Sequence, residues 1–343
     1  MYALEQPFKT RITELFGIRY PILGGGLMWL SDARYVAALV NAGCMGFITP
    51  RSFNTAEDFR EQLLRCRELT AGKAFGVNLT LSSRSEMNRQ VPVWLEIAIE
   101  MGVRHFETAG SAPAQLVHDI HNANGVVIHK ASSVRHVLAA EAAGVDAVAI
   151  VGMEEGGHPG MNELPGSILA ALAAAKLRVP VALGGGIGTG AQMLAVLAQG
   201  LDGVVMGSRF LVCDEINIHV AYKEHLTTCD ENSTIRVLQS LRNTWRVLAN
   251  ATAREIEALE KTGVSDYAAY GDLISGTTAR DHCYRNGDWQ KGMLSLGPAI
   301  AFATKIEPLR AIVDGLMEDA VAALARLNQL SGLQLTARKP REV

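Results

Sequence analysis

Cysteine is scarce in this sequence, and its cysteines follow no pairing pattern. The 343 residues include only five, and no two of them form a C-x-x-C pair. An odd, scattered set is typical of reduced thiols in a cytosolic protein, where most act as small buried hydrophobic groups. They are Cys44, Cys66, Cys213, Cys229 and Cys283.

Long apolar runs and an excess of one charge are also lacking. The Ala-rich stretch 168–176 is too short to cross a bilayer, and the N-terminal segment MYALEQPFKTRITELFG has no signal-peptide core. The 32 Lys and Arg against 35 Asp and Glu give a net charge of −3, so no basic field attracts nucleic acid. These absences predict a cytoplasmic protein that acts on a small-molecule substrate, without nucleic acid or membrane. They are compatible with a homodimer.

Several catalytic signatures are missing. The sequence has no G-x-S-x-G elbow, no P-loop and no H-x-H, H-E-x-x-H or carboxylate cluster with metal spacing. We therefore expect no metal site. No early G-x-G-x-x-G opens a first βαβ unit. A doubly wound open sheet is therefore less favoured than the barrel described next.

Eight short apolar runs alternate with helical patterns over the first 210 residues. Continuous apolar strands suit a parallel sheet covered on both faces, and eight strand–helix units predict a (β/α)8 barrel. Polar caps and closing glycines punctuate the helices, as at Thr55 with Asp58 and at Gly43. The predicted strands are 20–23, 46–49, 75–81, 105–108, 126–129, 147–151, 179–183 and 203–206.

The composition of the sequence changes after Phe210, where charged residues and helix formers replace the strand pattern. We predict helices at 219–226, 233–241 and 252–261, and a long final helix at 308–330 that completes the barrel. The expected division is a barrel of residues 1–212 and 271–330, a small helical cap inserted after the eighth strand at 213–270, and a tail at 331–343.

Two glycine-rich segments end the seventh and eighth strands. They are Leu183-Gly184-Gly185-Gly186-Ile187-Gly188 and Met206-Gly207-Ser208-Arg209. In barrels these two loops often bind a phosphate through backbone amides, and glycine lets the backbone approach it closely. The alternative for either loop alone is a plain turn.

Other strand ends carry polar or glycine residues that point to a site. The loop Met153-Glu154-Glu155-Gly156-Gly157-His158-Pro159-Gly160 places one imidazole after the sixth strand. Asn78 and Lys130 lie near the ends of the third and fifth strands, and Glu107 is a candidate partner for Lys130. A run of three glycines, Gly24-Gly25-Gly26, follows the first strand.

Taken together, these segments resemble one known family. Pro21-Ile22 before the glycine run, Gly76-Val77-Asn78-Leu79, Ile128-His129-Lys130, the His158 loop, Gly185-Gly186 and Met206-Gly207-Ser208-Arg209-Phe210 occur in order. The set resembles the nitronate monooxygenase (2-nitropropane dioxygenase-like) family of FMN-binding TIM barrels, nearest to the branch with bacterial NADH:quinone reductases. Flavin-dependent enoyl-ACP reductases share that fold.

The resemblance implies FMN at the C-terminal mouth of the barrel, with His158 as the catalytic residue. It implies cofactor binding by Gly24, Gly25, Gly26, Asn78, Lys130, Gly184, Gly185, Gly186, Met206, Gly207 and Ser208. It places Met28, Gly157 and Ser295 on the substrate side. Relatives usually carry Gln, Asp and Ser where this chain has Gly24, Val151 and Gly184.

The implied activity is oxidation of nitronates and nitroalkanes with O2 as acceptor. The alternative is an NAD(P)H:quinone reductase that uses FMN as a relay and NAD(P)H as a co-substrate. An enoyl-thioester reductase is a more distant alternative, and a non-enzymatic flavin-binding protein is the contrasting class.

Overall fold

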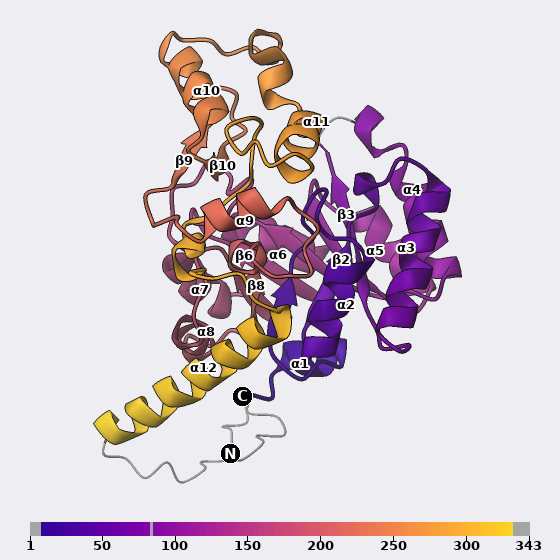
Figure 1. Cartoon of the computed structure of the whole chain (residues 1–343). Helices are drawn as coiled ribbons and strands as arrows, with labels where there is room; N and C mark the ends of the chain where they lie inside the picture. Colours follow the sequence, from indigo (N-terminus) through magenta and orange to yellow (C-terminus); the bar gives the residue numbers. More distant parts are fainter. Residues whose placement is uncertain (1–7, 83–84, 332–343) are drawn as a thin grey trace.

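The chain folds as a closed eight-stranded parallel barrel, which confirms the predicted (β/α)8 architecture (Figure 1). The computed structural model describes residues 8–82 and 85–331. Each strand pairs with the next, and β1 pairs with β8 to close the ring. The strands are β1 (Ile22–Gly24), β2 (Met45–Ile48), β3 (Gly76–Leu81), β4 (His105–Gly110), β5 (Val126–Ala131), β6 (Ala147–Val151), β7 (Val181–Gly184) and β8 (Gly203–Met206).

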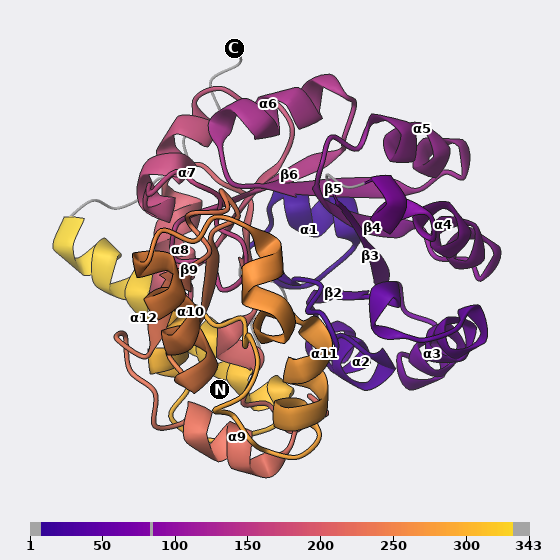
Figure 2. The same ribbon diagram turned by 90° about the horizontal axis from the view of Figure 1, so that it is seen from above.

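A ring of helices surrounds the barrel (Figure 2). Capping side chains begin several of them: Thr55 forms the predicted capping box with Asp58, and Asp32 and Ser133 each accept a first-turn amide hydrogen bond. The final helix packs against α8 and α2 and so takes the place of the eighth barrel helix. These helices are α2 (Ala33–Ala42), α3 (Ala56–Leu69), α4 (Val91–Glu100), α5 (Ala114–Asn122), α6 (Val134–Ala142), α7 (Gly166–Ala174), α8 (Gly190–Ala198) and α12 (Leu309–Ser331).

A short helix that the apolar pattern did not predict, α1 (Arg11–Phe16), lies across the N-terminal end of the barrel (Figure 2). Its side chains Ile12 and Phe16 join the inward-facing residues of the strands in one buried cluster. Because α1 fills this end, the open end of the barrel is the C-terminal one. The loops after the strands therefore carry the site, as in other barrels of this kind.

The cap above the C-terminal end is not purely helical, and the predicted helix 233–241 is wrong. Residues Thr234–Val237 form β9, which pairs antiparallel with β10 (Trp245–Leu248). Three of the four residues in Thr-Ile-Arg-Val are β-branched, which favours a strand, and Leu238 and Arg242 turn the chain at positive φ. Other elements between β8 and α12 are α9 (Val220–Leu226), α10 (Ala251–Lys261), the 3-10 segment η4 (Tyr267–Ile274), α11 (Gly276–Thr278) and the π-helical turn η5 (Ala279–Tyr284).

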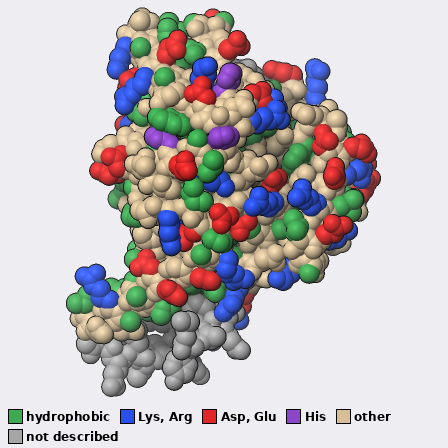
Figure 3. All heavy atoms as spheres, viewed as in Figure 1, with side chains coloured by type: hydrophobic (Ala, Val, Ile, Leu, Met, Phe, Trp, Pro, Cys, Tyr) green, Lys and Arg blue, Asp and Glu red, His purple; other side chains and the backbone are tan. Residues whose placement is uncertain are grey.

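A small hydrophobic cluster joins Val237, Val247, Ile256 and Tyr270 of the cap with Met293 of the following segment. We keep the division into barrel (1–212 and 271–330) and cap (213–270) as a proposal. Apart from Ser331, the predicted tail lies outside the described residues. No helix within residues 8–82 and 85–331 is long and apolar enough to cross a membrane. Acidic and basic side chains are interspersed over the face shown in Figure 3.

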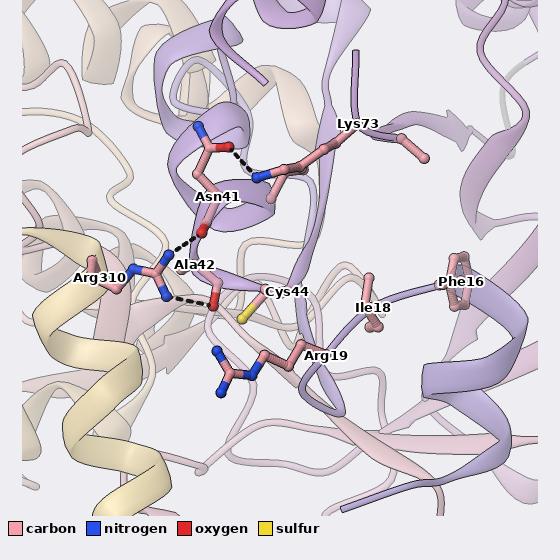
Figure 4. Close-up of a pocket in the computed structure, with 12 residues that line it drawn as sticks. Phe16, Ile18, Arg19, Asn41, Ala42, Cys44, Lys73 and Arg310 are labelled. Carbon is pink, nitrogen blue, oxygen red and sulfur yellow. Dashed lines mark hydrogen bonds between the residues drawn. The ribbon is translucent and has the colours of Figure 1, made fainter. Parts of the chain in front are cut away.

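A cavity of about 370 Å³ lies at the N-terminal end of the barrel, opposite the predicted site (Figure 4). Two cationic side chains that line it, Arg310 and Lys73, bind the C-terminal end of α2. Arg310 donates to the backbone oxygens of Asn41 and Ala42, and Lys73 Nζ lies 3.2 Å from Asn41 Oδ1. Cations at a helix C-terminus satisfy its free carbonyl groups and interact favourably with its dipole, so this cluster has a structural role.

Candidate active site

The loop after β6 is fastened to the cap by backbone hydrogen bonds. Gly157 N donates to Arg246 O over 3.0 Å, and Arg246 N donates back to Gly157 O over 2.7 Å. The guanidinium Nε of Arg246 also donates to Met153 O over 2.9 Å. Strand β10 of the cap thus holds the loop that the sequence singled out. Arg246 was missed because it lies between the predicted helices 233–241 and 252–261, where no strand was expected.

His158 is held in one tautomer at this junction. Its Nδ1 lies 3.2 Å from the carbonyl oxygen of Thr244. Because a carbonyl only accepts, Nδ1 carries the proton and Nε2 keeps its lone pair. Part of the side chain is open to solvent, yet desolvation by the surrounding protein lowers the pKa of His158. The Thr244 carbonyl opposes this shift and Lys130 adds to it. The ring is therefore a neutral base at neutral pH.

An indole forms one wall beside this base. The rings of His158 and Trp245 are 4.8 Å apart with 33° between their planes. Trp245 Nε1 donates to Ser295 Oγ over 2.8 Å, which fixes the indole. Two of the three predicted substrate-side residues, Gly157 and Ser295, meet here, because a Cβ on Gly157 would lie 4.0 Å from Ser295 Oγ. The third, Met28, is 40% exposed on the loop after β1, where its sulfur contacts Ser52.

A buried charge cluster lies inside the mouth of the barrel. Lys130 Nζ is 3.9 Å from Glu107 Oε1, which confirms the predicted partner, and 3.6 Å from Glu155 Oε1. Glu107 Oε2 also accepts hydrogen bonds from Gly26 N, at 3.0 Å, and from the side-chain amide of Asn78. The cluster therefore brings together the loop after β1, residues within β3, β4 and β5, and the His158 loop.

Glu155 was missed by the sequence analysis, although it lies three residues before His158. Burial raises its pKa to about 7, Lys130 opposes the shift and Glu107 adds to it. For Lys130, burial lowers the pKa, but the two carboxylates outweigh burial and leave it raised. Lys130 is thus a permanent cation, whereas Glu155 titrates close to neutral pH.

The glycine loops after β7 and β8 present backbone donors. The amides of Gly185, Gly186, Gly207 and Ser208 make no hydrogen bond to another residue within the described parts of the chain. Gly185 and Gly186 have φ of +91° and +76°, and a Cβ on Gly185 would lie 2.8 Å from Glu155 N. Glycine is therefore required there. The resulting backbone conformation leaves two amides free to bind an anion.

These residues fit the expected flavin phosphate on one side of the mouth and its ring system on the other. A Cβ on Gly25 would lie 3.9 Å from Lys130 Nζ, and one on Gly26 only 2.5 Å from Asn78 Cβ, so both glycines border the polar cluster. Two predicted residues can contribute through the backbone only. A side chain at Gly24 would point at Leu39 of α2, and Met206 is buried, with its carbonyl accepting from Gly25 N.

The unusual residues Val151 and Gly184 compensate for each other. They are register partners on β6 and β7, and a Cβ on Gly184 would lie 2.8 Å from Val151 Cγ1. The valine therefore fills the space that a side chain at 184 would need. The pair closes the barrel interior with apolar contact in place of polar groups.

This packing predicts a non-additive pair of variants. Gly184→Ser is expected to lower the free energy of unfolding by about 1–3 kcal/mol, because the new side chain overpacks Val151. In the Val151→Ala background the same change is expected to cost about 1 kcal/mol less. Urea unfolding of the two single variants and the double variant measures the coupling. Val205→Ala is the control, since a Cβ at 184 would make only ordinary contact with Val205 Cβ, at 3.5 Å. Additive losses in the Val151 cycle would contradict the account.

The closed (β/α)8 barrel has free amides after β7 and β8, a lysine near the end of β5 and a neutral histidine in the loop after β6. This set defines a class of barrel oxidoreductases that hold a flavin at the mouth. The sequence matches the nitronate monooxygenase family over residues 9–319. The chain belongs to that family and is a flavin-dependent oxidoreductase.

Similar proteins span more than one activity. The chain is 30% identical over 253 residues to (3aS,4S,5R,7aS)-5-hydroxy-7a-methyl-1-oxo-octahydro-1H-indene-4-carboxyl-CoA dehydrogenase of Mycobacterium tuberculosis, covering 73% of this chain and 69% of the relative. It is 28% identical to a probable nitronate monooxygenase of Staphylococcus aureus (strain Newman), covering 78% and 85%. Among solved structures, FabK from Thermotoga maritima superposes with a TM-score of 0.85 at 27% identity, covering 94% and 99%.

Proposed function

We propose that this protein is an FMN-dependent monooxygenase that oxidises nitronates and their parent nitroalkanes with O2 as acceptor. The observation that carries the proposal is the state of His158. Its proton lies on Nδ1, bonded to the Thr244 carbonyl, and its pKa is lowered, so Nε2 is a base at neutral pH.

The roles of the other residues follow from their positions. The amides of Gly185, Gly186, Gly207 and Ser208 would hold the FMN phosphate, and Gly25, Gly26, Asn78 and Lys130 would border its ring system. When bound, FMN would accept an electron pair from the substrate and pass it to O2. His158 Nε2 takes the α-proton of a neutral nitroalkane, and the cation of Lys130 favours the negative charge that this leaves. Trp245 covers one side of the imidazole and limits water access to it.

Acyl-CoA thioesters are a second candidate substrate class. The dehydrogenase of Mycobacterium tuberculosis named above acts, by its name, on a carboxyl-CoA. A thioester, like a nitro group, acidifies the adjacent C–H, so the same His158 Nε2 would serve as the base. The two classes differ at the reacting group and share the proton-abstraction step.

The proposal predicts a pH dependence for a neutral nitroalkane. Because removal of the α-proton needs unprotonated His158, kcat/KM is expected to fall as pH drops through an ionisation below the ordinary value of 6.5. O2 consumption measured with freshly dissolved nitroalkane records the profile. A profile with no such ionisation, or absence of O2 consumption with both nitroalkane and nitronate, would contradict the proposal.

A further inference from the structure

Two carboxylates share one ammonium group inside the mouth of the barrel. Glu107 and Glu155 lie 3.9 and 3.6 Å from Lys130 Nζ. The side chains of Glu107, Lys130 and Glu155 are 2%, 18% and 17% exposed, so screening by solvent is weak. With both carboxylates ionised, the cluster carries a net charge of −1. An anion that approaches Lys130 would then meet a negative field, so Lys130 stabilises an anion only when one of the two carboxylates is protonated.

The two carboxylates are not equivalent. Both oxygens of Glu107 are engaged, because Oε2 accepts hydrogen bonds from Gly26 N and the Asn78 amide and Oε1 lies 3.9 Å from Lys130 Nζ. The causes that act on Glu155 are burial, Glu107 and Lys130, with Lys130 alone favouring the charged form. When the cluster must lose one negative charge, the proton therefore goes to Glu155.

The neighbouring titratable groups do not take over this role. His158 is neutral, and its Nδ1–H donates a hydrogen bond to the Thr244 carbonyl. The carboxylate of Glu154 accepts from Gly166 N, at 3.2 and 3.0 Å from its two oxygens, and so caps α7. Arg246 is bound to Met153 O and to Thr234. Glu155 is therefore the group among these whose protonation can change when an anion binds at Lys130.

We propose that the mouth holds an anion-binding position at Lys130, and that an oxyanion of the nitronate class binds there together with one proton taken up by Glu155. Protonation turns the Glu155 carboxyl into a hydrogen-bond donor and leaves Lys130 balanced by Glu107 alone, so the cluster becomes neutral. The inference rests on the proposed function for the identity of the substrate anion. By taking up or releasing this proton, Glu155 would determine how well the site accepts a negatively charged ligand.

The sign of the pH dependence follows from linkage. Below the pKa of Glu155, which is about 7, the proton is already in place and affinity for the anion is at its maximum. Above it, binding has to take up a proton, so affinity is expected to fall about tenfold for each pH unit. The slope is opposite to that expected for the base His158, whose limb lies at lower pH.

Nitrate is a suitable probe, because it shares the planar O–N–O group of a nitronate. It would be titrated into the flavin-loaded protein while the visible flavin spectrum is recorded, from about one pH unit below to one above the pKa of Glu155. For the wild type, the dissociation constant is expected to rise about tenfold over this range, with about a fivefold rise in the upper unit. In Glu155→Gln, which mimics the protonated acid, it should stay low and independent of pH.

Glu163→Gln is the matched control, because Glu163 lies on the same loop, is 56% exposed and pairs with Arg236. It should keep the wild-type slope. Calorimetry in two buffers of different ionisation enthalpy counts the proton independently, with one expected for the wild type above neutral pH and none for Glu155→Gln. A wild-type slope retained in Glu155→Gln, a flat wild-type profile or no nitrate binding at any pH would overturn the inference. Since nitrate binding needs no turnover, failure to oxidise nitronates would leave this result readable.

Discussion

Replacing His158 by alanine is expected to lower kcat/KM for a neutral nitroalkane by about 10²- to 10⁴-fold, the range for loss of a general base. The same variant should oxidise the preformed nitronate within about tenfold of the wild type, because that substrate has already lost its α-proton. The split arises because Nε2 is the atom with a free lone pair, while Nδ1 is committed to the Thr244 carbonyl. Steady-state O2 consumption with the two forms of one nitroalkane measures it.

The control for this variant is His118→Ala, on the exposed face of α5 where His118 bonds to Asn122. It should leave both substrates unaffected. Equal loss with the neutral nitroalkane and the nitronate would mean that His158 binds the nitro group and does not take its proton. No loss with either would remove His158 from the mechanism.

Gly207→Asp is expected to weaken FMN binding by at least about 100-fold, or about 2.7 kcal/mol. The change places a carboxylate in the loop that carries two of the four free amide donors, and like charges brought together cost several kcal/mol. The backbone tolerates a side chain here, since φ is −134° and a Cβ would lie 3.4 Å from Leu27 Cδ2. Fluorescence titration of the apoprotein with FMN measures the loss.

Gly207→Ala separates charge from size. It adds the same Cβ without the carboxylate and should bind FMN within about tenfold of the wild type. Both variants should unfold at wild-type urea concentrations in the absence of FMN. If Gly207→Asp bound FMN as tightly as Gly207→Ala, the phosphate would have to lie elsewhere than at the β7 and β8 loops.

The barrel could be predicted because its signals are local. The strands Ala147–Val151 and Gly203–Met206 occur at the predicted residues, and the capping box of Thr55 and Asp58 begins α3. Each depends on apolar runs or on contacts three residues apart. The cap was harder: β9 and β10 pair with each other, whereas the sequence pattern placed a helix over β9 and no element over β10.

The site was predictable residue by residue and less so in its contacts. Strand-end position marked Asn78, Lys130 and His158, because in a parallel barrel those ends share one mouth. Glu155 lies in the same loop as His158 but was not singled out, and Trp245 follows no predicted strand. Glu155 matters because of Lys130, 25 residues earlier in the chain, and Trp245 reaches His158 only because the cap folds over the barrel. From the sequence alone, Val151 and Gly184 stood out only because they lack polar groups. The register of β6 and β7 shows that Val151 fills the space that a side chain at position 184 would need.

Anaerobic mixing of the flavin-loaded protein with a nitronate tests the central claim most directly. The account predicts that the nitronate bleaches the visible flavin absorption in the absence of O2 and that admission of O2 restores it. Rapid bleaching by NADH or NADPH, with none by the nitronate, would contradict the account and favour a quinone reductase.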